Sequence, residues 1–201
     1  MKCPALFLLV SAALLGCVSD SPEDGAVALQ YRKLFEAGRR AEYKGDVKIA
    51  EDTYGWLIGR DNRYGEYGLA MLRLRSESSC GEAVKHLLAC AKRSNNNSAM
   101  DSAFSAAAIA RLCDIAASEH DKPDVAAALR RMMFDIITPQ VEAWAEEMNA
   151  DADLAVIYGD IISAVKSSRQ ISEHANAFTW DEIGKVFLNG ETDNAALGDE
   201  R

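Results

Sequence analysis

The sequence contains little that would build a β-sheet. Only 7% of the 201 residues are aromatic, and proline occurs four times. Ala, Leu, Ile and Val dominate the apolar residues, and no segment shows convincing alternation of apolar and polar positions, which is the pattern of a half-buried strand. Apolar residues instead recur at helical spacing along almost the whole chain. The composition therefore favours an all-α protein.

Sequence motifs for catalysis are missing as well. The chain has no G-x-S-x-G, no glycine-rich phosphate-binding loop, no H-E-x-x-H and no C-x-x-C. Glu82, His86 and Cys90 follow one another at intervals of four, so they share one face of a predicted helix. Three ligands spread over roughly 12 Å of helix cannot all reach one ion. We interpret them as a helix-surface pair beside a buried cysteine, and we expect no metal site and no enzymatic activity.

A surplus of positive charge is also absent. The net charge is -9, and residues 101–201 carry 19 acidic against 8 basic residues. A protein that binds duplex nucleic acid should show the opposite sign. We therefore expect no nucleic-acid partner.

No apolar run is long enough to cross a membrane. The run from Ala5 to Leu15 has about 11 residues, where a spanning helix needs about 20. It follows a single positive charge, Lys2, and ends in small residues, as in a secretory signal peptide. The stretch Leu14-Leu15-Gly16-Cys17 resembles the lipobox of bacterial lipoproteins. The alternatives are an ordinary secreted protein and a buried apolar segment.

The lipobox resemblance implies an address in the bacterial cell envelope. Residues 1–16 would be removed, and Cys17 would carry a diacylglycerol and a fatty acid, with no other cofactor. Two or more acyl chains anchor a protein stably. Residues 17–25 would form the lipidated cysteine and a polar tether, and the domain would face the periplasm. Val18, in place of the Asp that retains some lipoproteins in the inner membrane, favours the outer membrane.

Nine helices are predicted from the apolar spacing and from local start and stop signals. Lys122-Pro123 and Thr138-Pro139 place proline at a first helical position, and Thr179 with Glu182 forms a capping box. The predicted helices span 26–44, 46–59, 64–75, 80–93, 99–118, 123–137, 139–149, 152–171 and 179–189. Residues 191–201 are expected to be a disordered tail.

The first helices resemble tetratricopeptide and Sel-like repeats. Gly38 and Gly68 occupy matching positions in two successive helix pairs, as do Ala50 and Ala83. The resemblance implies a short α-solenoid of antiparallel helix-turn-helix repeats over residues 26–137, with residues 138–190 as a C-terminal helical cap. A generic helical bundle is the alternative.

Three cysteines remain after Cys17, and an exported protein would meet an oxidising compartment. If helices 80–93 and 99–118 form an antiparallel hairpin, Cys80 and Cys113 lie equally far from its turn. We predict a Cys80–Cys113 disulfide and a buried, unpaired Cys90. Three buried thiols are the alternative.

In repeats of this kind the first helices of each pair line a concave groove. The matching positions here are Arg32, Arg39, Tyr43, Arg73 and Arg75. Clustered Arg and Tyr are common at protein interfaces, although a solvated helix face has the same composition. The pattern predicts a groove for an acidic segment of another cell-envelope protein.

The sequence thus predicts a lipid-anchored adaptor that binds another envelope protein. One alternative is an envelope enzyme or ligand-binding protein with a pocket among the C-terminal helices, using Trp144, Tyr158 and Trp180. Another is a structural subunit that associates with itself.

Overall fold

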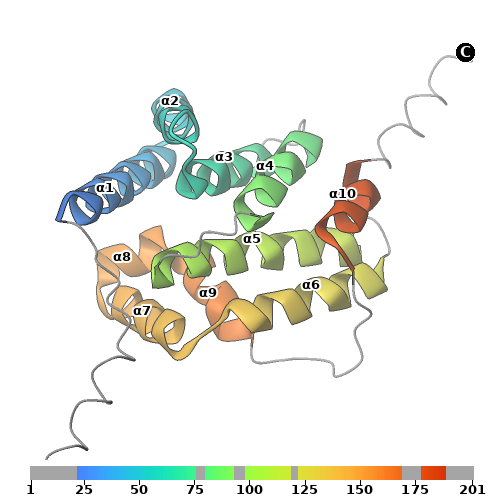
Figure 1. The fold of residues 1–201 in the computed structure, drawn as a ribbon. Coiled ribbons are helices and arrows are strands. Elements are labelled where there is room, and N and C mark those ends of the chain that lie inside the picture. The colour runs from blue at the N-terminus through green and yellow to red at the C-terminus, as the bar shows by residue number, and fades with distance from the viewer. Residues whose placement is uncertain (1–21, 76–79, 93–97, 119–121, 169–177, 189–201) are drawn as a thin grey trace, which may run out of the picture.

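The protein is an all-α fold in the computed structural model, which describes residues 22–75, 80–92, 98–118, 122–168 and 178–188, and only the backbone at 22–24 (Figure 1). The predicted signal peptide at 1–16, Cys17 and the predicted tail at 191–201 lie outside these residues. The described chain forms ten helices: α1 (Pro22–Lys44), α2 (Val47–Ile58), α3 (Arg63–Arg75), α4 (Cys80–Lys92), α5 (Ala99–Ser118), α6 (Pro123–Ile136), α7 (Pro139–Ala150), α8 (Ala152–Ile157), α9 (Gly159–Ser167) and α10 (Trp180–Leu188).

The helix ends follow the predicted signals. Gly45, with φ of 82°, supplies the left-handed residue that turns the chain from α1 into α2. Pro123 and Pro139 open α6 and α7. At the start of α10, Glu182 accepts a hydrogen bond from the backbone N–H of Thr179 at 2.7 Å, and Thr179 Oγ1 accepts from the Glu182 N–H at 3.3 Å. The predicted capping box is therefore confirmed.

Helices α1 to α6 pack chiefly against their neighbours in the chain. The closest approach surrounds Tyr54 of α2, which is fully buried between α1 and α3. A Cβ atom on Gly38 would lie 2.5 Å from the Tyr54 ring, and one on Gly68 would lie 2.4 Å from it. The two glycines were expected to let helices approach closely, and both make room for the same tyrosine.

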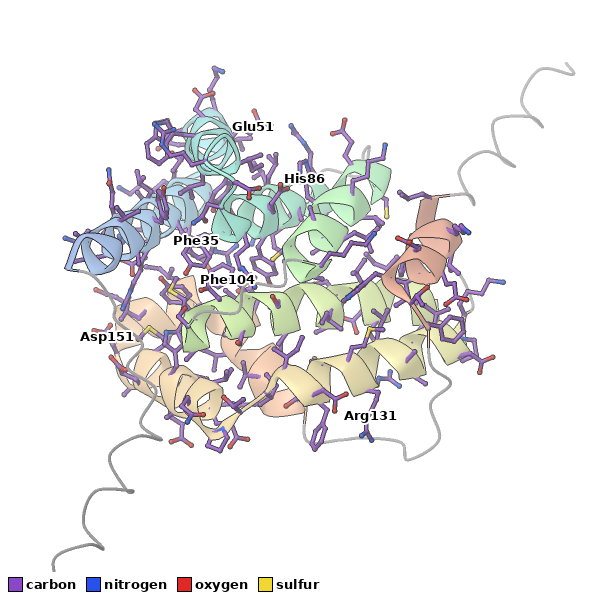
Figure 2. All side chains as sticks on the ribbon, viewed as in Figure 1. Phe35, Glu51, His86, Phe104, Arg131 and Asp151 are labelled. Atoms are coloured by element: carbon purple, nitrogen blue, oxygen red, sulfur yellow. The ribbon has the colours of Figure 1, made fainter. Side chains whose placement is uncertain are left out.

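The last four helices return to the first ones. Helices α7 and α9 pack on α5, α8 reaches α1, and α10 packs against α4, so the chain is not a simple row of hairpins (Figure 1). Phe35 of α1 and Phe104 of α5 meet edge to face at 4.8 Å between ring centres, near the middle of the molecule (Figure 2). Tyr158, between α8 and α9, stacks on Phe35 at 5.7 Å. The core therefore joins both ends of the chain.

Two predicted boundaries were wrong. The tether was expected to extend to residue 25, but α1 begins at Pro22, since proline is a favourable first helical residue. The helix predicted at 152–171 is divided at Tyr158, whose φ and ψ are -104° and 10°. Gly159, a weak helix former, follows Tyr158 directly, but the apolar spacing continues through both residues and the break was missed.

The predicted Cys80–Cys113 disulfide is absent from the structure. Cys80 is exposed at the first residue of α4, whereas Cys113 is buried. The Cys113 thiol faces α6 instead, where it donates a hydrogen bond to the Ala126 carbonyl at 3.4 Å. Equal distance from a turn did not ensure that the two side chains face each other. Burial raises the pKa of Cys113, and Cys90 is buried as predicted.

Candidate binding cleft between the first and last helices

The break at Tyr158 supplies the contacts that join α8 to α1. A helix end leaves its last carbonyl groups without partners inside the helix. Arg39 Nε donates to the Ile157 carbonyl at 3.2 Å, and Tyr43 Oη donates to the Val156 carbonyl at 2.7 Å. Both side chains come from α1, and a cation at a helix C-terminus is electrostatically favourable. Two predicted groove residues therefore bind the protein's own C-terminal region.

Arg39 is not on an open surface, and this part of the groove prediction was wrong. Its side chain is only 3% exposed. Its guanidinium pairs with Glu42 at 3.2 Å and with Asp160 of α9 at 3.4 Å. Burial disfavours the charged form, but the carboxylates of Asp160 and Glu42 outweigh it, so the pKa of Arg39 is raised.

The two carboxylates around Arg39 also bind buried tyrosines. Tyr67 of α3 donates to Asp160 at 3.1 Å, and Tyr54 donates a short hydrogen bond to Glu42. Burial raises the pKa of both phenols, and the neighbouring carboxylates raise it further. Both tyrosines therefore stay protonated and act as hydrogen-bond donors that hold the carboxylates in place.

A cleft of ≈ 430 Å³ opens beside this network. Its polar lining comprises three arginines and one aspartate, with apolar groups around them. The lining residues that matter below are Arg39, Tyr43, Leu74, Arg75, Arg111, Val156 and Asp160. We call this surface the arginine cleft.

The arginines of the cleft differ in how freely they meet solvent. Arg75, the last residue of α3, has a side chain that is 48% exposed and pairs with the almost fully buried Glu42 at 2.6 Å. Arg111 of α5 is 41% exposed and pairs with Asp114, also exposed, at 3.6 Å. Tyr43 and Val156 expose 52% and 57% of their surface at the rim. The cleft thus combines accessible guanidinium groups with exposed aromatic and aliphatic surface.

The other two predicted groove residues lie elsewhere. Arg32 pairs with Glu36 at 3.0 Å and lies 3.5 Å from the Met148 sulfur of α7. Arg73 faces α2, where it pairs with Glu51 at 2.5 Å. The five predicted residues therefore do not form one stripe, and only Arg39, Tyr43 and Arg75 meet at the arginine cleft.

His86 of α4 has a hydrogen-bonding partner on α3. Its Nδ1 lies 2.6 Å from a carboxylate oxygen of Glu66, a residue of α3 that is 8% exposed (Figure 2). Within the described residues, no group of three His, Cys, Asp or Glu side chains is arranged to hold a metal ion.

The three aromatic residues suggested for a C-terminal pocket do not gather in one place. Tyr158 is fully buried, and Trp144 of α7 packs edge to face on it at 5.5 Å. Trp180 opens α10, which packs against α4. These side chains fill the core and its margin rather than enclosing a ligand.

Sequence reasoning missed Arg111, Val156 and Asp160 as members of the cleft. Arg111 lies in the predicted repeat region, but the groove positions were taken only from the first two helix pairs. Asp160 lies in the predicted C-terminal cap and had no assigned partner. No sequence signal marked them, because the need of Arg39 for a carboxylate follows from its burial, which only the structure shows.

Comparisons with protein-family models, with curated proteins and with solved structures found no match. In the part of the chain that the structure describes, every helix is too short or too polar to span a bilayer.

Proposed function

We propose that the protein is a lipid-anchored adaptor of the bacterial cell envelope, attached through Cys17 and facing the periplasm, with the outer membrane favoured. The observation that carries the binding role is the convergence of Arg75, Arg111, Tyr43 and Val156 on one open cleft. Arginine and tyrosine are enriched at the energetic centres of protein interfaces.

The partner we propose is an acidic segment of another envelope protein. Arginine binds carboxylates through two parallel hydrogen bonds. The lining of the cleft has three arginines against one aspartate. Glu42 lies beneath it and is already shared by Arg39, Arg75 and Tyr54. Asp160, Glu42 and Asp114 already balance the three arginines, so a carboxylate of the partner would bind by joining or replacing the exposed pairs of Arg75 and Arg111.

The proposal keeps the resemblance to tetratricopeptide and Sel-like repeats for helices α1 to α4. Helices α1 to α4 would be two divergent tetratricopeptide-like or Sel-like hairpins, in which Gly38 and Gly68 both accommodate Tyr54. Their concave face would be covered by α5, which packs on α3 and α4, and by α8, which reaches α1. The arginine cleft would be the part left for a partner.

The test is an Arg111→Glu variant of the tagged protein, crosslinked in its native cells. Arg111 is the best position because its ion pair with Asp114 is exposed, so reversing its charge should leave folding intact. The matched control is Arg131→Glu on α6, which also breaks an exposed pair, with Asp135 at 3.5 Å (Figure 2).

We expect the wild type and Arg131→Glu to capture the same envelope protein and Arg111→Glu to lose it. With the purified partner, affinity should fall about tenfold, which corresponds to about 1.4 kcal/mol. Equal capture by all three chains would contradict the role of the cleft. A partner that is a second copy of this chain would replace the adaptor with a self-associating subunit.

A further inference from the structure

The first turns of α1 project from the fold with an apolar surface. Every residue from Gly25 to Gln30 is exposed, and no residue from Gly25 to Tyr31 is charged. Val27 is 43% exposed and Leu29 is 49% exposed. These two side chains point in nearly opposite directions, because successive helical residues are about 100° apart. Residues 25–30 of α1 therefore carry no charge on any side, although Glu23 and Asp24 precede them in the same helix.

An exposed apolar helix segment of this kind is normally covered by another apolar surface. A helix that is apolar all round is normally buried, whereas a surface helix carries charge on its outer face. Farther along, α1 obeys this rule, since Phe35 is fully buried while Lys33 and Arg40 are exposed. Figure 1 shows the start of α1 at the edge of the fold, where α1 extends past the helices that cover its second half.

Aromatic and basic side chains surround the base of this projection. Tyr31 lies one turn after Val27 on the same face, and its ring centre is 6.3 Å from that of Trp56 in α2. The Arg60 guanidinium lies 3.3 Å above the Trp56 ring centre. Tyrosine and tryptophan concentrate where a membrane meets water, and arginine extends from there to the headgroups.

The proposed lipid anchor lies close to this surface. Four residues separate Cys17 from Pro22, and these five residue-to-residue steps place the start of α1 within about 18 Å of the anchor even in a fully extended chain. Residues 25–30 are about 9 Å long as a helix. Interfacial helices enter the boundary between headgroups and acyl chains by about 5–10 Å.

We infer that the start of α1, residues 25–30, inserts into the leaflet that holds the acyl chains of Cys17, with Tyr31 and Trp56 at the level of the headgroups. This inference rests on the proposed lipid anchor. Asp20, Glu23 and Asp24 precede the apolar stretch, so α1 must lie along the membrane surface, where these carboxylates stay among the headgroups. Attraction to anionic lipids does not drive this insertion, and it should persist at high salt. Insertion would fix the orientation of the arginine cleft relative to the membrane.

The experiment uses the lipidated full chain in vesicles of phosphatidylethanolamine and phosphatidylglycerol. Nitroxide labels are placed on Val27→Cys, on Leu29→Cys and, as a matched control, on Phe134→Cys, an exposed position of α6. All three variants carry Cys80→Ser, because Cys80 is exposed and would also react. Electron paramagnetic resonance then reports the accessibility of each label to oxygen, which enters lipid, and to a water-soluble nickel complex.

We expect the labels at residues 27 and 29 to lose accessibility to nickel and to gain accessibility to oxygen, while the label at residue 134 keeps the opposite preference. The mass of the mature N-terminus in the same sample reports the lipid on Cys17. A lipidated chain whose label at residue 27 meets nickel as freely as the one at residue 134 would overturn the insertion and leave the anchor standing. Shielding of residue 27 from both reagents, with spin–spin broadening, would also overturn it by placing a second copy there. Insertion of an unlipidated chain would support the inference and refute the anchor.

Discussion

Each half of α1 contains side chains whose burial is the opposite of what their residue type suggests. The first half is apolar and exposed, from Gly25 to Gln30. The second half carries Arg39, which is 2% exposed and held by groups from α8 and α9. A charge is buried where it joins distant parts of one chain, and apolar surface is left open where we propose that a membrane covers it. Burial in this helix therefore follows the available partners more closely than residue type.

The largest loss of stability is expected when the buried charge of Arg39 is removed. Arg39→Met removes the partner of Asp160 and Glu42 and leaves two carboxylates in the interior. We expect the free energy of unfolding to fall by about 3–5 kcal/mol, as is usual when one member of a buried ion pair is removed. Denaturant titration measures it.

The neighbouring residue provides the control for that measurement. Arg40 has a side chain that is 51% exposed and pairs with Glu36 at 3.5 Å. Arg40→Met should change the stability by about 0.5 kcal/mol or less. Equal losses in the two variants would contradict the buried role of Arg39.

A second comparison tests how closely the covered half of α1 and its neighbours pack. Gly68→Ala places a methyl group against the Tyr54 ring and should cost about 1–3 kcal/mol. Gly55→Ala, on the exposed side of α2, meets nothing within 4 Å. It should stabilise the helix by up to about 1 kcal/mol. Thermal unfolding of both variants checks the opposite signs, and two changes of the same sign would refute the packing around Tyr54.

The smallest effect is expected at the open half of α1. Val27→Ser removes exposed apolar surface that touches little of the fold. Its stability in the absence of membrane should stay within about 0.5 kcal/mol of the wild type. A loss of 2 kcal/mol or more, on the scale of burying a whole valine side chain, would show that Val27 packs inside the protein. Chemical denaturation decides between these results.

Local signals in the sequence predicted most of the helices and some of their packing. Apolar spacing located nine helical segments, one of which is divided into two helices in the structure. Thr179 with Glu182 marked the start of α10, and Gly38 and Gly68 marked the places where helices pack closely. These features depend on residues a few positions apart, or on the small size of glycine, and both can be read from a sequence.

The return of the C-terminal helices was not predictable in the same way. Arg39 meets Ile157 and Asp160 across more than a hundred residues. No local pattern links such positions, and arginine at helical spacing normally indicates an exposed face. The break at Tyr158 was hidden for a related reason, since it is stabilised by Arg39 and Tyr43 from another helix. The sequence therefore pointed to Arg39, Tyr43 and Arg75 of the arginine cleft. It did not point to Arg111, Val156 and Asp160.

The most direct test of the closed arrangement is a double-mutant cycle between Arg39 and Asp160. Arg39→Met, Asp160→Asn and the double variant are unfolded by denaturant together with the wild type. If α9 closes on α1 through this pair, the two losses will be non-additive, with a coupling free energy of about 1–3 kcal/mol. A parallel cycle between Arg40 and Asp160 should give a coupling near zero. Additive losses for Arg39 and Asp160 would contradict the closure and return Arg39 to an open groove.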